Sequence, residues 1–138
     1  MDNKDSKILE ILKLDSRLPI RDIAKKTSLR PSTVHQRLKK LKYEKVIEKF
    51  TIKLNNKAID ESFIVFMLIN TSKDLEETFF HNKHLKEAFG LTGEYDLLLK
   101  LKFKDIEEFN SFIINLRKNK SIRKTLTMIA TINLKEEL

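Results

Sequence analysis

A group of polar and basic side chains in the first third of the chain has the chemistry to bind a nucleic acid. Most of them lie on a predicted helix over residues 31–43, whose apolar residues Val34, Leu38 and Leu41 fall on one face. The amide of Gln36 can hydrogen-bond an adenine base, whereas lysine and arginine neutralise phosphates. We predict DNA contacts from Lys25, Arg30, Ser32, Thr33, His35, Gln36, Arg37, Lys39 and Lys40.

The positive charge of the chain is concentrated around this helix. The net charge is +8, and residues 1–57 carry 16 Lys and Arg against 7 Asp and Glu, a net charge of +9. Residues 58–138 carry 12 against 13, a net charge of −1. A lysine-rich composition would raise lysine in both halves, but it does not account for the acids that balance the second half. The asymmetry therefore indicates that the first half binds a polyanion.

Three short helices and a β element are expected to position these side chains. Apolar residues repeat at helical spacing over residues 4–14 and 20–26, and Pro31 opens the third helix where its missing N–H costs little. Residues 46–54 alternate between apolar and polar, which is typical of a strand or hairpin. Residues 1–55 are therefore predicted to form a winged helix-turn-helix DNA-binding domain. By itself, the polar face of the third helix is equally compatible with an ordinary solvated surface.

The remaining residues have the pattern of a second domain. The polar residues 55–57 mark the domain boundary, residues 56–62 form the predicted linker, and residues 63–138 form the predicted second domain. Sequences typical of capping boxes begin at Asp74 and Asp105 and predict a helix after each. Strand patterns occur at residues 63–70, 88–92, 97–103 and 122–134.

The resulting order is strand, helix, two strands, helix and strand, which is that of a ferredoxin-like domain. The predicted fold class of the chain is therefore α+β. Two helices on one face of a four-stranded sheet leave the other face bare. We expect this bare face, carrying Met67, Leu98, Met128 or their strand neighbours, to pair with another copy of the chain, because large apolar patches rarely stay exposed.

Both halves of the chain resemble the Lrp/AsnC ("feast/famine") family of transcription regulators. Residues 91–99 are similar to the family's Thr-Gly-x-x-Asp turn, which joins the second and third strands of its ligand-sensing domain. The chain departs from the family at Ser28 and Lys45, and near Asn56, where glycine is common in the family. In the first half the resemblance rests on residues 5–9, 15–18, 23–25, 29, 32–33, 37–41 and 46–47.

The resemblance implies homodimers, often assembled further into tetramers or octamers, that bind pseudo-palindromic promoter sites in double-stranded DNA. It also implies that an amino acid or related metabolite binds between C-terminal domains and shifts assembly or DNA affinity. Backbone N–H groups of the glycine turn would bind a carboxylate, and Asp96 would hold an α-ammonium group. The implied effector-binding residues are Phe89, Gly93, Glu94, Tyr95, Asp96, Met128, Ile129 and Ala130.

The turn from Gly93 to Asp96 also has a purely structural interpretation. In it the glycine shapes a hairpin, and the aspartate hydrogen-bonds its own backbone. The closest alternative function is accordingly an effector-independent activator, repressor or chromatin organiser of the same fold.

Other classes of function find less support in the residues. The chain has no cysteine, which excludes disulfides, thiol catalysis and zinc fingers. It has no glycine-rich phosphate loop and no nucleophile elbow, so we expect neither enzyme activity nor a cofactor. His81 and His84, late in a predicted helix, form too incomplete a ligand set for a metal site. RNA binding by the sheet would need exposed aromatic residues, whereas residues 97–102 are aliphatic or lysine.

The chain also has no membrane-directed segment that we recognise. Its first residues are charged and lack the apolar region of a signal peptide. The longest apolar stretch, residues 63–69, is too short to span a bilayer. We therefore expect no membrane contact and a cytoplasmic, nucleoid-associated protein.

Overall fold

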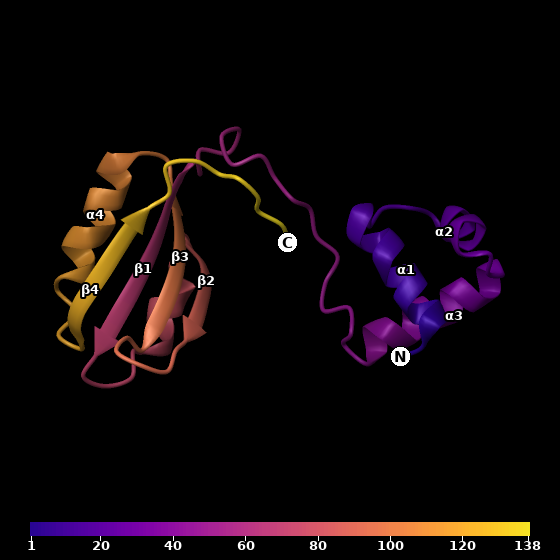
Figure 1. Cartoon of the computed structure of the whole chain (residues 1–138), viewed down its shortest axis with the longest axis horizontal. Coiled ribbons are helices and arrows are strands. Elements are labelled where there is room, and N and C mark those ends of the chain that lie inside the picture. The colour runs from indigo at the N-terminus through magenta and orange to yellow at the C-terminus, as the bar shows by residue number, and fades with distance from the viewer. The chain divides into compact units, whose positions relative to one another are not determined.

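The computed structural model describes all of residues 1–138 and divides them into two compact units (Figure 1). The first unit is Met1–Ile52 and the second is Lys53–Leu138, so the division falls at Ile52 rather than at residue 55. None of the helices combines the length and the apolar character that a membrane span requires.

The first unit is a bundle of three helices, as the sequence predicts: α1 (Asn3–Leu14), α2 (Ile20–Thr27) and α3 (Pro31–Tyr43). The start of α1 is set by a capping box, in which the carboxylates of Asp2 and Asp5 each accept a hydrogen bond from the backbone N–H of the other. Pro31 begins α3 at its first turn. The core contains Ile8, Leu12, Ile23, Ala24 and Val34, all of which are at most 9% exposed.

The turns on either side of α3 are built without glycine. Ser28, which ends α2, and Lys45, which follows α3, both have φ of 57°, in the left-handed region that glycine occupies most easily. Both turns are therefore made by residues for which this conformation is less favourable than it is for glycine. Backbone hydrogen bonds hold both turns: the N–H of Leu29 donates to the carbonyl of Ala24, and that of Val46 to the carbonyl of Leu41.

The prediction of a strand or hairpin over residues 46–54 is wrong for this chain. The segment has no regular secondary structure and pairs with no strand. An alternating pattern forms a ladder only where a second backbone supplies the partner groups, and the sheet is formed by other residues. Phe50, Ile52 and Leu54 are consequently 48%, 65% and 50% exposed. The first unit is therefore a helix-turn-helix without the wing.

The second unit has the predicted α+β architecture: a four-stranded antiparallel sheet in the order β2-β3-β1-β4. Its central strands are β1 and β3, and α4 lies along one face (Figure 1). The buried core on that face is formed by Val65, Met67, Leu99, Phe103 and Phe109 with their neighbours. The elements are β1 (Phe63–Thr71), the 3-10 helix η1 (Glu77–His81), β2 (Leu85–Gly90), β3 (Leu97–Phe103), α4 (Ile106–Leu116) and β4 (Ile122–Ile129).

Two boundaries and one helix differ from the sequence prediction. The helix expected after Asp74 is only the five-residue η1, which has no side-chain cap, whereas Asp105 caps α4 as predicted by accepting from the backbone N–H of Glu108. The strand β2 begins before residue 88, and β4 ends at Ile129 rather than at residue 134. Phe79 of η1 nevertheless packs against the core, so the short helix covers the same face as α4.

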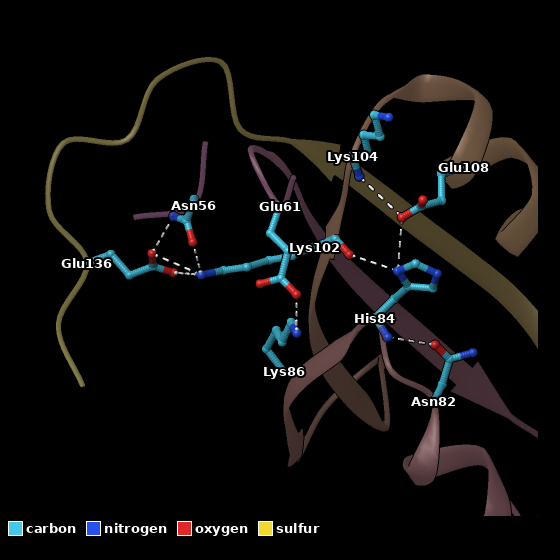
Figure 2. Close-up of polar contacts among 9 residues, drawn as sticks. All are labelled: Asn56, Glu61, Asn82, His84, Lys86, Lys102, Lys104, Glu108 and Glu136. Atoms are coloured by element: carbon cyan, nitrogen blue, oxygen red, sulfur yellow. Dashed lines mark hydrogen bonds and ion pairs between the residues drawn. The ribbon is translucent and has the colours of Figure 1, made fainter. Parts of the chain in front are cut away.

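The two histidines therefore do not share a helical face. His81 is the last residue of η1, and His84 lies beyond it. The Nδ1 of His84 is 3.0 Å from the carbonyl oxygen of Lys102 and 3.3 Å from the carboxylate of Glu108, and its ring stacks on Phe103 (Figure 2). This contact ties the start of β2 to β3 and α4.

The other side of the sheet, which we call the open face, is apolar and has no helix on it. The strand register places Leu98 and Met128 on this face, as predicted. The prediction for Met67 is wrong, because this side chain points to the helix side of the sheet and is fully buried. An error of one residue in register moves a side chain to the opposite face, because side chains alternate along a strand. The open face is defined by Phe66, Leu68, Phe89, Leu98, Leu126 and Met128.

A polar clasp joins three distant segments of the second unit at the end of the sheet nearest the linker (Figure 2). The ammonium of Lys102 donates to the side-chain oxygen of Asn56 at 2.7 Å and lies 3.0 Å from the carboxylate of Glu136. Asn56 also donates to Glu136 at 2.9 Å, and Lys100 pairs with the same carboxylate. Burial alone would raise the pKa of Glu136, but these contacts outweigh it and lower that pKa to about 2. The clasp thereby ties the linker and the chain's last residues to β3.

Candidate nucleic-acid interface and effector turn

The exposed face of α3 carries most of the residues predicted to contact DNA. Val34 and Leu41 are buried, and the side chains on the other side of the helix are left to solvent. Thr33 and Arg37 are only partly exposed. The fully exposed members of the predicted set are Lys25, Arg30, Ser32, His35, Gln36, Lys39 and Lys40.

The N-terminus of α3 has free hydrogen-bond donors. Its N-cap residue is Arg30, whose side chain makes no capping hydrogen bond, and no acidic residue lies in the first turn. The first N–H groups of a helix have no partner within it, and the helix dipole makes this end attractive to anions. Because Pro31 has no N–H, the donors at this end belong to Ser32 and Thr33. The start of α3 is thus suited to a phosphate oxygen.

Arg37 differs from the other basic residues of α3 because it meets two carboxylates and is only partly exposed, whereas Lys40 makes a single exposed pair with Glu44 at 4.0 Å. Its guanidinium donates to the carboxylates of Asp2 and Asp5, the second at 3.3 Å. The backbone N–H of Asp5 and the guanidinium of Arg37 together lower the pKa of Asp2 to about 2, and Asp2 in turn raises the pKa of Arg37. A surface hollow of about 380 Å³ adjoins this contact, lined by Met1, Asp2, Asp5, Gln36, Arg37 and Lys40.

Sequence reasoning missed this ion pair. Asp2 is the N-cap of α1 and Asp5 lies in its first turn, and only the packing of α1 on α3 brings both acids to Arg37. The clasp around Glu136 was also missed, and no local pattern identifies it, since its members are separated by 34 to 80 residues.

The turn from Gly93 to Asp96 is anchored to the end of β1. Gly93 has φ of 116°, a conformation that favours glycine. The carboxylate of Asp96 accepts hydrogen bonds from the backbone N–H of Thr71 at 2.7 Å and from its hydroxyl at 3.2 Å. The carbonyl of Glu94 accepts from the side chain of Asn70. The glycine thus shapes the turn, and the aspartate holds it against β1.

The rest of the predicted effector site is spread along the sheet. Glu94 pairs with Lys124 at the start of β4, which lowers the pKa of Glu94, and the ammonium of Lys124 also lies 5.1 Å from the ring centre of Tyr95. Residues 128–130 lie four to six residues further along β4, roughly 13–20 Å away at the usual rise of a strand. Met128 and Phe89 stand on the open face, whereas Ile129 pairs with Val65 on the other side. A single chain therefore does not gather these residues into one pocket.

Comparison with known proteins covers both units. Residues 1–42 match the AsnC-type helix-turn-helix domain, and residues 65–138 match the Lrp/AsnC ligand binding domain. The HTH-type transcriptional regulator FL11 of Pyrococcus furiosus is 34% identical over 133 residues, which cover 94% of this chain and 88% of that protein. FL11 of Pyrococcus abyssi is also 34% identical, over 140 residues, covering 99% of this chain and 93% of that protein.

Solved structures agree with the sequence comparison. The crystal structure of an AsnC family transcriptional regulator from Agrobacterium tumefaciens superposes with a TM-score of 0.92 at 26% identity, covering 99% of this chain and 94% of that one. The regulator NMB0573 of Neisseria meningitidis, solved as a complex with L-Met, has the same fold, with a TM-score of 0.90 at 22% identity and the same coverage. The chain belongs to the Lrp/AsnC family of transcriptional regulators, with a helix-turn-helix DNA-binding domain followed by a ligand-binding domain.

Proposed function

We propose that this regulator binds pseudo-palindromic promoter sites in double-stranded DNA through α3. The observation that carries the proposal is the exposed face of α3, which carries Ser32, Gln36 and Lys40 and begins at an uncapped helix N-terminus. Lysine and arginine side chains supply most of the affinity by displacing counterions from phosphates. Gln36, helped by Ser32 and Thr33, supplies sequence preference through base edges. The mechanism is binding and not catalysis, and it operates in the cytoplasm on the nucleoid.

Fluorescence anisotropy with two labelled duplexes tests this proposal. One duplex comes from the region upstream of the protein's own gene and the other has the same composition in scrambled order, and both are titrated over a salt series. Tight, salt-dependent binding that favours the native duplex supports a sequence-specific regulator. Equal binding to both duplexes would instead indicate a chromatin-like role, and no binding at low salt would refute the proposal.

Two variants of α3 separate base reading from phosphate contact. Gln36→Ala should weaken binding to the native duplex by about tenfold and leave the scrambled duplex nearly unaffected, since one bidentate base contact is worth ~1–3 kcal/mol. Lys40→Ala should weaken both duplexes alike and reduce the salt slope by about 1. Equal loss on both duplexes for Gln36→Ala would contradict its role as a base reader.

We further propose that the functional particle is at least a homodimer that closes over the open face. Leu126 and Met128 are 45% and 43% exposed there, and Phe89 is 56% exposed. An apolar sheet face of this kind is stabilised when a second copy covers it. Sedimentation at micromolar concentration should give a dimer or a larger assembly, and a monomer would contradict the proposal.

We also propose that an amino acid or related metabolite controls the protein at the Gly93–Asp96 turn. The L-Met complex of the Neisseria meningitidis regulator supports an amino-acid ligand. Because this turn and residues 128–130 lie far apart within a single chain, the pocket would need residues from two copies of the chain. Calorimetric titration with the twenty amino acids tests this proposal. An amino acid that binds and changes the affinity for DNA would support control by an effector.

One observation favours an effector-independent regulator as the second candidate. The carboxylate of Asp96, which the first proposal assigns to an α-ammonium group, already accepts two hydrogen bonds from Thr71. If no amino acid binds while DNA binding is intact, the turn is structural and the second candidate holds.

A further inference from the structure

Arg37 lies among the predicted DNA contacts, but its side chain is held by other residues of the protein. It lies on α3 between Gln36 and the lysines at residues 39 and 40, yet its side chain is only 27% exposed. It meets two carboxylates, of which that of Asp5 is 6% exposed. Since two acids face one guanidinium, the group as a whole carries a negative charge. A phosphate approaching Arg37 would therefore encounter Asp2 and Asp5 as well.

The same two carboxylates determine where α1 begins. Asp2 accepts from the N–H of Asp5, and Asp5 accepts from the N–H of Asp2. Both acids are thus held by the backbone, and neither can follow Arg37 freely if that side chain moves. The pKa of Asp2 is about 2, so its charge is present at every pH at which the protein would meet DNA. The contact is a permanent tie between the start of α1 and the middle of α3.

This tie complements the apolar contacts between the helices. Ile8 and Leu12 of α1 pack with Val34 of α3 in the core, and the directed ion pair adds a geometric constraint to these apolar contacts. Gln36 precedes Arg37 directly, and Lys40 lies one turn further along the same hollow. A small rotation of α3 would move both side chains relative to a bound groove.

We propose that Arg37 is a positioning residue for DNA recognition and not a phosphate contact. The strut formed by Asp2, Arg37 and Asp5 sets the orientation in which α3 presents Gln36 and Lys40. The proposal rests on DNA reading by α3 and assigns a role to the basic residue of α3 that is held by two acids.

The test compares Arg37→Met with Arg30→Met, which removes the same charge from an exposed arginine that forms no ion pair in the structure. Each variant is titrated by anisotropy against the native and scrambled duplexes over a salt series. Arg37→Met should reduce the preference for the native duplex about tenfold and leave the salt slope unchanged. Arg30→Met should weaken both duplexes alike and lower the slope by about 1.

Asp5→Asn sharpens the comparison because it removes one of the two charges that hold Arg37 and keeps a side-chain oxygen that can still accept from the N–H of Asp2. If Arg37 is a strut, Asp5→Asn should also reduce the preference for the native duplex, although it adds a net positive charge. The double variant Arg37→Met/Asp5→Asn should then lose no more than the stronger single variant. Tighter binding by Asp5→Asn to both duplexes, or a lower salt slope for Arg37→Met, would overturn the proposal.

Arg37→Lys decides the matter if Arg37→Met does not fold in circular dichroism. Both hydrogen bonds to the acids come from one guanidinium nitrogen, Nη1, and the shorter side chain of lysine ends one bond short of that position while it keeps the charge needed at a phosphate. Reduced native preference for this variant supports the strut, and unchanged preference overturns it. A wild-type protein with no preference between the duplexes would be a failure of the proposed function, which is distinct from these outcomes.

Discussion

The two units differ in how much of their candidate chemistry one chain provides. The first unit presents most of its candidate DNA contacts on one helix, from Ser32 to Lys40, and the core behind them is buried. The second unit spreads its candidate effector residues along a sheet and leaves Leu126 and Met128 exposed. Residues close in sequence on one helix share a surface automatically, whereas a pocket between domains requires a second copy. The first surface is therefore complete in the monomer and the second is not.

The starts of α3 and α4 show the same contrast on a smaller scale. At α4, Asp105 accepts from the N–H of Glu108, and acids occupy the first turn. At α3 the N-cap side chain accepts nothing and no acid is present. A satisfied helix start contributes to stability, while an unsatisfied one remains available to an anion. The start of α4 is therefore used by the fold of the second unit, whereas the start of α3 in the first unit is left free.

The largest expected effects come from removing core side chains, which tests whether the two units are stabilised independently. Ile23→Ala in the first unit and Leu101→Ala in the second should each cost about 2–4 kcal/mol, because both residues are at most 1% exposed. In scanning calorimetry Ile23→Ala should lower only the transition of the first unit, and Leu101→Ala only that of the second. A common shift of both transitions would mean that the units unfold together.

A charge on the open face should have the next largest effect and tests whether the second unit is completed by another copy. Leu126→Glu should weaken self-association by about 10- to 100-fold, because an unpaired carboxylate would be buried at the contact. Thr125→Glu is the matched control, since it is exposed but points to the other side of the sheet. Sedimentation equilibrium measures both, and an equal effect of the two variants would place the contact elsewhere.

The clasp joins distant segments of the second unit as the contact of Arg37 with Asp2 and Asp5 does in the first, and Glu136→Gln tests it. Loss of the charged hydrogen bonds should cost the second unit about 1–3 kcal/mol at pH 7. Because the pKa of Glu136 falls from 4.5 to about 2 on folding, this stabilisation is complete above pH 4.5 and disappears as the pH falls through 2. Thermal melts of the wild type and of Glu136→Gln at a series of pH values should therefore show stabilities that converge as the pH falls from 4.5 through 2. Glu137→Gln, an exposed neighbour, should change little.

The smallest effect concerns the turn before α3. Ser28→Gly should stabilise the first unit by about 0.5–1 kcal/mol, because glycine adopts φ of 57° without the penalty that serine incurs. Lys26→Gly, within α2, should destabilise it by about 1 kcal/mol. Thermal melts measure both changes. If Ser28→Gly were destabilising, the turn would depend on the serine side chain and not on its backbone conformation.

Local signals explain which parts of the fold the sequence could predict. Asp2 and Pro31 mark the starts of α1 and α3 because capping and proline geometry depend only on neighbouring residues. The alternation over residues 46–54 and the capping-box pattern at Asp74 were misleading, because whether a segment forms a strand or a full helix depends on partners elsewhere. Met67 was placed on the wrong face because the register of β1 is set by pairing with β3 and β4.

The candidate sites also divide into residues that local sequence signals predict and residues that depend on distant partners. The exposure of Gln36 and Lys40 follows from helical periodicity alone, so sequence was sufficient for them. The partners of Arg37 lie 32 and 35 residues away, and those of Asp96 lie 25 residues away. Side-chain contacts over such separations are created by the tertiary fold, and no spacing rule anticipates them.

The segment that follows α3 has a practical consequence for proteolysis. Lys45, Lys49 and Lys53 are all exposed, and from residue 48 to residue 55 the backbone has no regular secondary structure. Proteases cut most readily where an exposed backbone can enter their active site in extended form, so the lysines within helices should be cut more slowly. Brief digestion with trypsin is expected to cleave here first. Mass spectrometry would then find two folded fragments, one able to bind DNA and the other able to self-associate.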